Sequence, residues 1–114
     1  MQAHLDQLDQ VLGQQVAGLT AIRNWLPRKI ELIKLHRLAD LEAFNQREEE
    51  QVVRLQQAES QRRVLLDLIA RELGLAAPPS LVELAALVPG GGARLLARRD
   101  QLAAVAAQIK DGQA

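Results

Sequence analysis

The feature that most constrains the fold is a long stretch, from Arg28 to Leu73, that contains neither proline nor glycine. These two residues interrupt helices most strongly, so the stretch predicts one long helix over residues 28–73. Gly74 follows where a left-handed C-cap favours glycine, and Leu75 supplies the usual hydrophobic closure. Such a helix would be on the order of 70 Å long, longer than a compact domain of this size is wide. We therefore expect an elongated rod, a shape that suits binding or scaffolding better than catalysis.

A leading segment over residues 3–26 carries an apolar seam of its own. Its members recur at a spacing of three and four residues, interrupted at Gln15, and are Leu5, Leu8, Leu12, Leu19, Ile22 and Leu26. This is the a and d spacing that packs one helix along another. Pro27 either starts the long helix or kinks one continuous helix. We expect a break or sharp bend between Asn24 and Pro27, with a turn nearer Ala39 and Asp40 as the competing placement.

Two shorter helices are predicted after the long one. Ser80 followed by Glu83 is a capping-box pattern, which starts a helix over residues 81–88. The glycine run Gly90–Gly92 is interpreted as a flexible hinge before a last helix over residues 93–110. We expect one all-α domain over residues 1–114, an elongated, coiled-coil-like antiparallel bundle. In it the short and last helices pack on the C-terminal half of the long helix.

Composition excludes several classes of protein. Lysine plus arginine equals aspartate plus glutamate, and this balance argues against nucleic acid as the partner. The zero net charge also gives little repulsion against self-association, so a homodimer remains an alternative to a monomer. There is no cysteine, which removes disulfides and thiolate ligands and suits the cytoplasm. No secretory signal is visible and no apolar run approaches the roughly 20 residues of a membrane span, so no membrane insertion is expected.

No catalytic, cofactor-binding or metal-binding constellation is visible, and we expect no enzyme. His4 and His36 lie far apart, and His36 has only Asp40 as a neighbour one turn on. The run Glu48–Glu50 points in different directions around a helix. Two arginine groups are interpreted as exposed residues with partners such as Arg63 with Asp67, or as a positive patch if the last helix folds back. They are Arg62, Arg63, Arg94, Arg98 and Arg99.

The last helix is the candidate binding element. Its apolar stripe is wider than one antiparallel partner covers. It either completes the bundle or offers a groove to a helix of another chain, and both remain open. The candidate partner-binding residues are Leu95, Leu96, Arg99, Leu102, Val105 and Ile109.

The order of these elements resembles that of the FlgN-type flagellar export chaperones. The most specific segment is REEEQVVRLQQAESQRRVLLDLIARELGL, which begins at Arg47; the closing helix is RLLARRDQLAAVAAQI. The remaining matches are the leading amphipathic helix, Leu73-Gly74-Leu75 and Leu81-Val82-Glu83-Leu84. The resemblance covers nearly the whole chain.

The resemblance implies a cytoplasmic, cofactor-independent chaperone of type III flagellar export. Such a chaperone holds the helical C-terminal segments of hook–filament junction proteins. It delivers them to export-apparatus components, which are further partners. By resemblance, binding falls on the last helix and its neighbouring face. The alternative is a structural coiled-coil adaptor or homo-oligomeric scaffold, in which a second copy covers the apolar stripe and the seam from Leu5 to Leu26 is the dimer contact.

Overall fold

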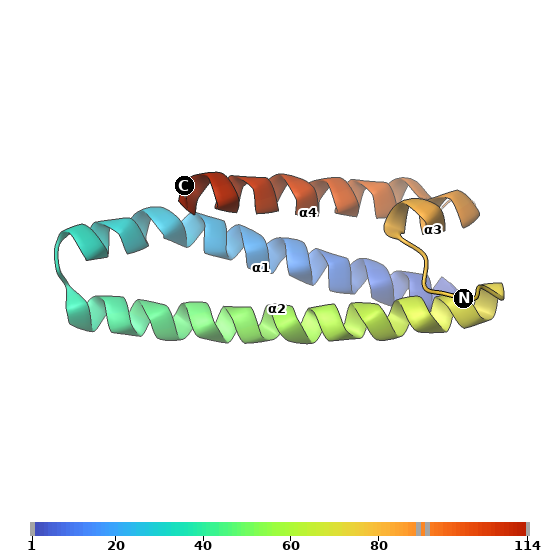
Figure 1. Cartoon of the computed structure of the whole chain (residues 1–114), viewed down its shortest axis with the longest axis horizontal. Helices are drawn as coiled ribbons and strands as arrows, with labels where there is room; N and C mark the ends of the chain where they lie inside the picture. Colours follow the sequence, from blue (N-terminus) through green and yellow to red (C-terminus); the bar gives the residue numbers. More distant parts are fainter. Residues whose placement is uncertain (1, 89, 91, 114) are drawn as a thin grey trace.

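The fold is a long helical hairpin with two further helices along one side (Figure 1). A computed structural model describes residues 2–88, 90 and 92–113. Its elements are α1 (Gln2–Lys34), α2 (Leu38–Leu73), α3 (Leu81–Leu87) and α4 (Gly92–Gln113). Over these residues the chain forms no strand, and its principal extents are 56 × 21 × 20 Å. The prediction of an elongated all-α bundle is confirmed.

The chain reverses at residues 35–37, later than expected. The helix α1 continues through Pro27 to Lys34, so the expected break between Asn24 and Pro27 is wrong, as is a single helix over 28–73. The competing placement near Ala39 and Asp40 lies closer to the real turn. His36 has a positive φ of 54° at the reversal, which is rare for a residue other than glycine.

Packing against α2 explains why α1 does not end at Pro27. A proline inside a helix costs about 3 kcal/mol. Beyond it, Leu32 is buried and the Lys29 ammonium lies 3.2 Å from the Glu48 carboxylate of α2. Just before it, the rings of Trp25 and Phe44 meet edge to face, with centroids 6.1 Å apart. The contacts of Leu32 and Lys29 stabilise the last two turns of α1, and a break at Pro27 would lose them.

The core lies where α1 and α2 run antiparallel, toward the N-terminal end of α1. The seam predicted for α1 is buried at Leu5, Leu8 and Leu12. Gly18 marks a close approach of the two helices, because a Cβ atom there would lie 2.8 Å from the Leu55 Cδ2 atom. The main cluster of buried core residues consists of Leu5, Leu8, Val11, Leu12, Ala58, Leu65, Ile69, Leu81, Leu84, Val88 and Leu95.

The predicted helix caps are present. Gly74 is left-handed, with φ 71°, and the N–H groups of Gly74 and Leu75 donate to the carbonyls of Arg71 and Ala70. The Ser80 hydroxyl accepts a hydrogen bond from the Glu83 N–H at 3.1 Å and starts α3. Of the expected glycine hinge, Gly90 is left-handed and Gly92 begins α4, while Pro89 and Gly91 lie outside the described residues.

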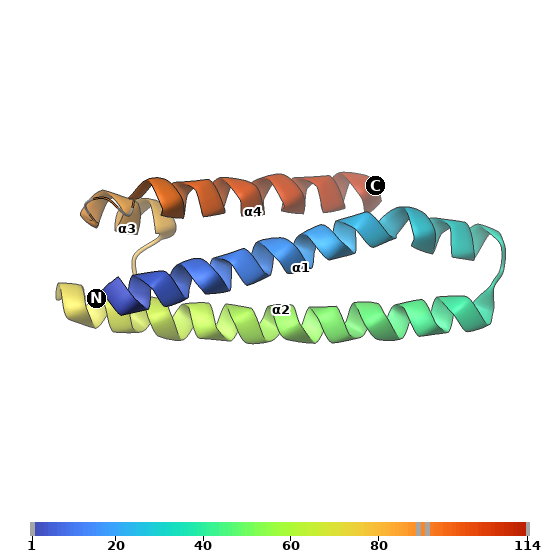
Figure 2. The same ribbon diagram turned by 180° about the vertical axis from the view of Figure 1, so that it is seen from behind.

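The helix α4 lies along α1 and runs parallel to it, as both views show (Figures 1 and 2). Arg94 contacts Asp9 and Arg23 contacts Gln108, each pair 85 residues apart. Over the described residues, no Cα atom of α4 comes within 8 Å of one in α2. The expectation that the last helix packs on the long second helix is therefore wrong. The helix α1 is the central element, with α2 and α4 as its two long neighbours.

Candidate functional site

The stripe predicted on α4 faces α1 rather than solvent. Leu95 and Val105 are buried, with exposed fractions of 3% and 4%. Leu102 is half-buried and packs against the core cluster. At these three positions the stripe completes the bundle within the chain, which was one of the two alternatives.

The remaining members of the stripe lie at its margins. Leu96 and Ile109 are half-buried. Arg99 is exposed, and its guanidinium donates to the Asp100 carboxylate at 2.9 Å. The part of the stripe that a partner could reach without moving α4 is therefore its edge, and whether these six residues bind a partner stays a prediction.

One carboxylate holds the start of α4 on α1. The Arg94 guanidinium donates to Asp9 Oδ2 at 2.8 Å, and the Arg98 Nε donates to Asp9 Oδ1 at 3.1 Å. The hydrogen bond from Arg98 is the main cause that lowers the pKa of Asp9 below 3.8, against the opposing effect of burial; both guanidinium charges add to it. We call these three residues the Asp9 clamp. Gly13 leaves room for it, because a Cβ atom there would lie 3.3 Å from the Arg98 Nη2 atom.

A polar contact also closes the other end of the α1–α4 interface. The Arg23 guanidinium donates to the Gln108 side-chain oxygen at 2.6 Å. The apolar contacts of Leu95, Leu102 and Val105 thus lie between two polar contacts. The arginine patch considered from the sequence is divided, since Arg94 and Arg98 bind α1 while Arg63 pairs with Glu59 at 3.5 Å rather than with Asp67.

The other polar residues noted in the sequence do not converge on one place. His4 contacts Glu72 across the hairpin, and Asp40 pairs with Arg37 at 2.7 Å rather than with His36. Within the described residues, no group of three histidine, cysteine, aspartate or glutamate side chains could hold a metal ion. The same residues contain no helix long and apolar enough to cross a bilayer.

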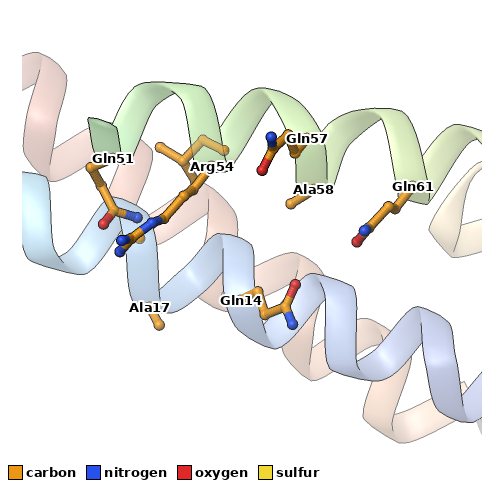
Figure 3. Close-up of a pocket in the computed structure, with 9 residues that line it drawn as sticks. Gln14, Ala17, Gln51, Arg54, Gln57, Ala58 and Gln61 are labelled. Atoms are coloured by element: carbon orange, nitrogen blue, oxygen red, sulfur yellow. The ribbon is translucent and has the colours of Figure 1, made fainter. Parts of the chain in front are cut away.

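Sequence reasoning missed a furrow between α1 and α2. Its central hollow is about 430 Å³ in volume and is lined by Gln14 and Ala17 from α1 and by Arg54, Ala58 and Gln61 from α2 (Figure 3). A hollow of about 530 Å³ adjoins it and shares Gln14 and Gln61 with it. A third, of about 300 Å³, lies toward the hairpin turn, between Trp25 and Phe44. The furrow exists only once two helices pair, so no single segment of the sequence signals it.

The fold places the protein in the class of elongated, all-α helical bundles. The model of the family described as FlgN protein matches residues 1–114. The chain therefore belongs to the FlgN family. This family is a chaperone family, and membership gives the chain the general role of a flagellar export chaperone. No curated protein and no solved structure matches the chain.

Proposed function

We propose that this protein acts in the cytoplasm as a chaperone of type III flagellar export for hook–filament junction proteins. It binds the helical C-terminal segments of these clients, keeps them competent for export and passes them to the export apparatus. The binding residues we propose are those of the α4 stripe: Leu95, Leu96, Arg99, Leu102, Val105 and Ile109.

The observation that supports this site is the attachment of α4 to a single long helix. The backbone of α4 lies next to α1 and α3, whereas α1 is also paired with α2. An amphipathic client helix can therefore replace the contact between α4 and α1 while α1 and α2 stay paired. The stripe is covered by α1 in the free protein and by the client in the complex.

This exchange has an energetic cost, because the stripe must first be uncovered. Uncovering Leu95 and Val105 costs about 1.5–3 kcal/mol for each fully buried side chain. A client helix with leucine or isoleucine at helical spacing recovers this energy when it covers the same stripe. The client's apparent affinity is lowered by the small fraction of molecules in which α4 is detached.

Calorimetric titration with C-terminal segments of hook–filament junction proteins tests the proposal. Leu96→Asp and Ile109→Asp change half-buried stripe residues and should abolish binding, while circular dichroism shows helix content retained. Ala104→Asp is the matched control, because it places the same side chain at an exposed position of α4 and should bind normally. Normal binding by both stripe variants would show that the client does not bind at the α4 stripe. If the wild-type chain bound none of these segments, hook–filament junction proteins would not be its clients.

A homo-oligomeric scaffold is the second candidate function, and one observation favours it. The hairpin turn carries four large aliphatic residues that are 43–74% exposed: Ile30, Ile33, Leu35 and Leu38. A second copy could cover them, whereas the seam from Leu5 to Leu12 is already buried within the chain. Light scattering separates the two functions, since a stable dimer that binds no client supports the scaffold.

A further inference from the structure

We propose that the furrow between α1 and α2 is a second docking site, and that its occupant is an acidic amphipathic helix of another protein. This site lies apart from the α4 stripe. On α1, Asp9 faces α4, whereas Gln14 lines the furrow and is rotated roughly 140° from Asp9 around the helix. In Figure 3 the faint red ribbon of α4 passes behind the helices that line the furrow.

The length of the furrow fits a helix. Its three hollows follow α1 from Gln7 to Leu32, a distance of about 37 Å at 1.5 Å per residue. The hollows occur in order along both helices, because the lining of α2 runs in the opposite direction from Leu68 to Asp40. A helix of about 25 residues would lie along all three. It would convert this side of the hairpin into a third packed helix layer.

The floor of the furrow supplies apolar contact in a narrow line. Val11, Ala58 and Leu65 are buried at its base. The hollow near the hairpin turn is lined by Trp25 and Phe44, the only aromatic residues in the chain. Aromatic side chains in a hollow are common anchors of protein interfaces. A partner with one apolar stripe, rather than an apolar surface all round, matches this floor.

The walls of the furrow determine the charge of the partner. Arg47 and Arg54 are seven residues apart on α2 and both are exposed. Within the described residues neither forms an ion pair or a side-chain hydrogen bond, unlike the arginines of the Asp9 clamp. The third guanidinium is that of Arg28 on α1, which is already paired with Glu31 at 3.2 Å. The one carboxylate in the lining, that of Asp40, is already paired with Arg37.

Excess positive charge in the furrow of a chain whose net charge is zero favours carboxylates on the occupant. Glutamates at a spacing of seven residues on a docked helix would lie opposite Arg47 and Arg54. Self-pairing of two furrows would instead bring the arginines of one copy against those of the other. The charge pattern therefore points to a different protein rather than to a second copy of this chain.

Two synthetic helical peptides test the proposal. Both carry one leucine stripe of 25 residues, flanked by glutamates in the first peptide and by lysines in the second. The fluorescence of Trp25, the only tryptophan, reports binding in the furrow. We expect saturable binding of the glutamate peptide, weakened by salt because the attraction is electrostatic, and little binding of the lysine peptide.

Charge reversal provides the decisive variant. The double variant Arg47→Glu with Arg54→Glu should bind the glutamate peptide with an affinity about tenfold lower than that of the wild type. It should bind the lysine peptide more tightly than the wild type does. Both positions are exposed, so folding is retained. Arg63→Glu is the control, because it makes the same change on α2 at a residue 77% exposed outside the furrow lining. Ile109→Asp should leave peptide binding unchanged, which separates this site from the proposed client site on α4.

Three results would overturn the proposal. One is equal binding of the two peptides, which would remove the charge argument. Another is binding of the glutamate peptide to the double variant with the same affinity as to the wild type. The third is a dimer by light scattering that the double variant dissociates, since the furrow would then bind a second copy of this chain.

Discussion

Removing the charge of Asp9 should increase the fraction of molecules in which α4 is detached from α1, without unfolding the hairpin. The Asp9 side chain is 14% exposed and its partner Arg98 is 33% exposed, so this charged hydrogen bond contributes about 1 kcal/mol after screening by solvent. Arg94 is 64% exposed, and its ion pair adds at most about 0.5 kcal/mol. The variant Asp9→Asn therefore loses about 1–1.5 kcal/mol of attachment, which corresponds to about tenfold more molecules with α4 detached.

Hydrogen exchange of backbone amides measures this detachment. Amides of α4 between Leu95 and Ile109 should exchange about tenfold faster in Asp9→Asn, while those around Ile69 of α2 should keep their wild-type rates. Asp6→Asn is the control, because Asp6 is exposed and its carboxylate accepts a hydrogen bond from Gln2 on its own helix. If client binding requires detachment, the affinity for the client should rise by up to the same factor.

The effect should depend on pH in a defined direction. The pKa of Asp9 is lowered in the folded protein, so its ionised form contributes stability that is fully present above the ordinary value of 3.8. This stability is lost as the pH falls through the lower folded value. The difference in unfolding free energy between wild type and Asp9→Asn should therefore be constant near neutral pH and vanish in strong acid. The Asp9 clamp would be refuted if the amides of α4 exchanged at equal rates in wild type and Asp9→Asn. It would also be refuted if the difference in unfolding free energy between the two persisted in strong acid.

Three further substitutions and one control variant test the fold by chemical denaturation. Gly74→Ala should lower the free energy of unfolding by about 1 kcal/mol. The cost comes from the left-handed backbone alone, since nothing lies within 4 Å of the added Cβ atom. A neutral result would show that α2 has no left-handed cap. Gly92→Ala should cost more, because its Cβ atom would lie 2.6 Å from the Ala85 carbonyl oxygen, and a smaller cost would show that the α3–α4 junction yields freely. Ile69→Ala should lower the free energy of unfolding by about 2–5 kcal/mol, because Ile69 is fully buried. The control Val64→Ala, at a residue 58% exposed, should change it by no more than about 0.5 kcal/mol. Similar costs for the two variants would contradict the assigned core.

Local signals in the sequence were sufficient for the helices and most of their ends. The seam of α1 predicted Leu5, Leu8 and Leu12 as core residues, and all three are buried. Gly74 and Ser80 cap α2 and α3 as expected, because capping depends on residues within one turn. Such features are decided by neighbours in the sequence, which a pattern can show.

The first turn was not predictable in this way. The reversal uses His36 in a left-handed conformation, where neither glycine nor asparagine signals it. Pro27 carries a strong local signal for a break, but contacts of Leu32 and Lys29 with α2 outweigh it. Tertiary packing overrides local preference here, and a single sequence does not show packing.

The candidate surfaces depended on pairings that spacing alone does not give. The stripe of α4 could be identified, but its partner helix could not, since α1 and α2 both offer apolar faces. The choice of α1 follows from contacts such as Asp9 with Arg98, 89 residues apart. The furrow likewise forms from side chains of two helices that lie far apart in the sequence, such as Gln14 and Gln61.

The packing of α4 on α1, and not on α2, has a consequence for how the protein is made. Residues 2–73 contain both members of the hairpin, so α1 and α2 can pair as soon as they are synthesised. The partner of Asp9 is added only with Arg94 and Arg98, after α3. At about 5–20 residues per second, synthesis of the segment from Gly74 to Gln113 takes about 2–8 s. Through that interval the α4-facing side of α1 lacks the helix that covers it in the finished protein.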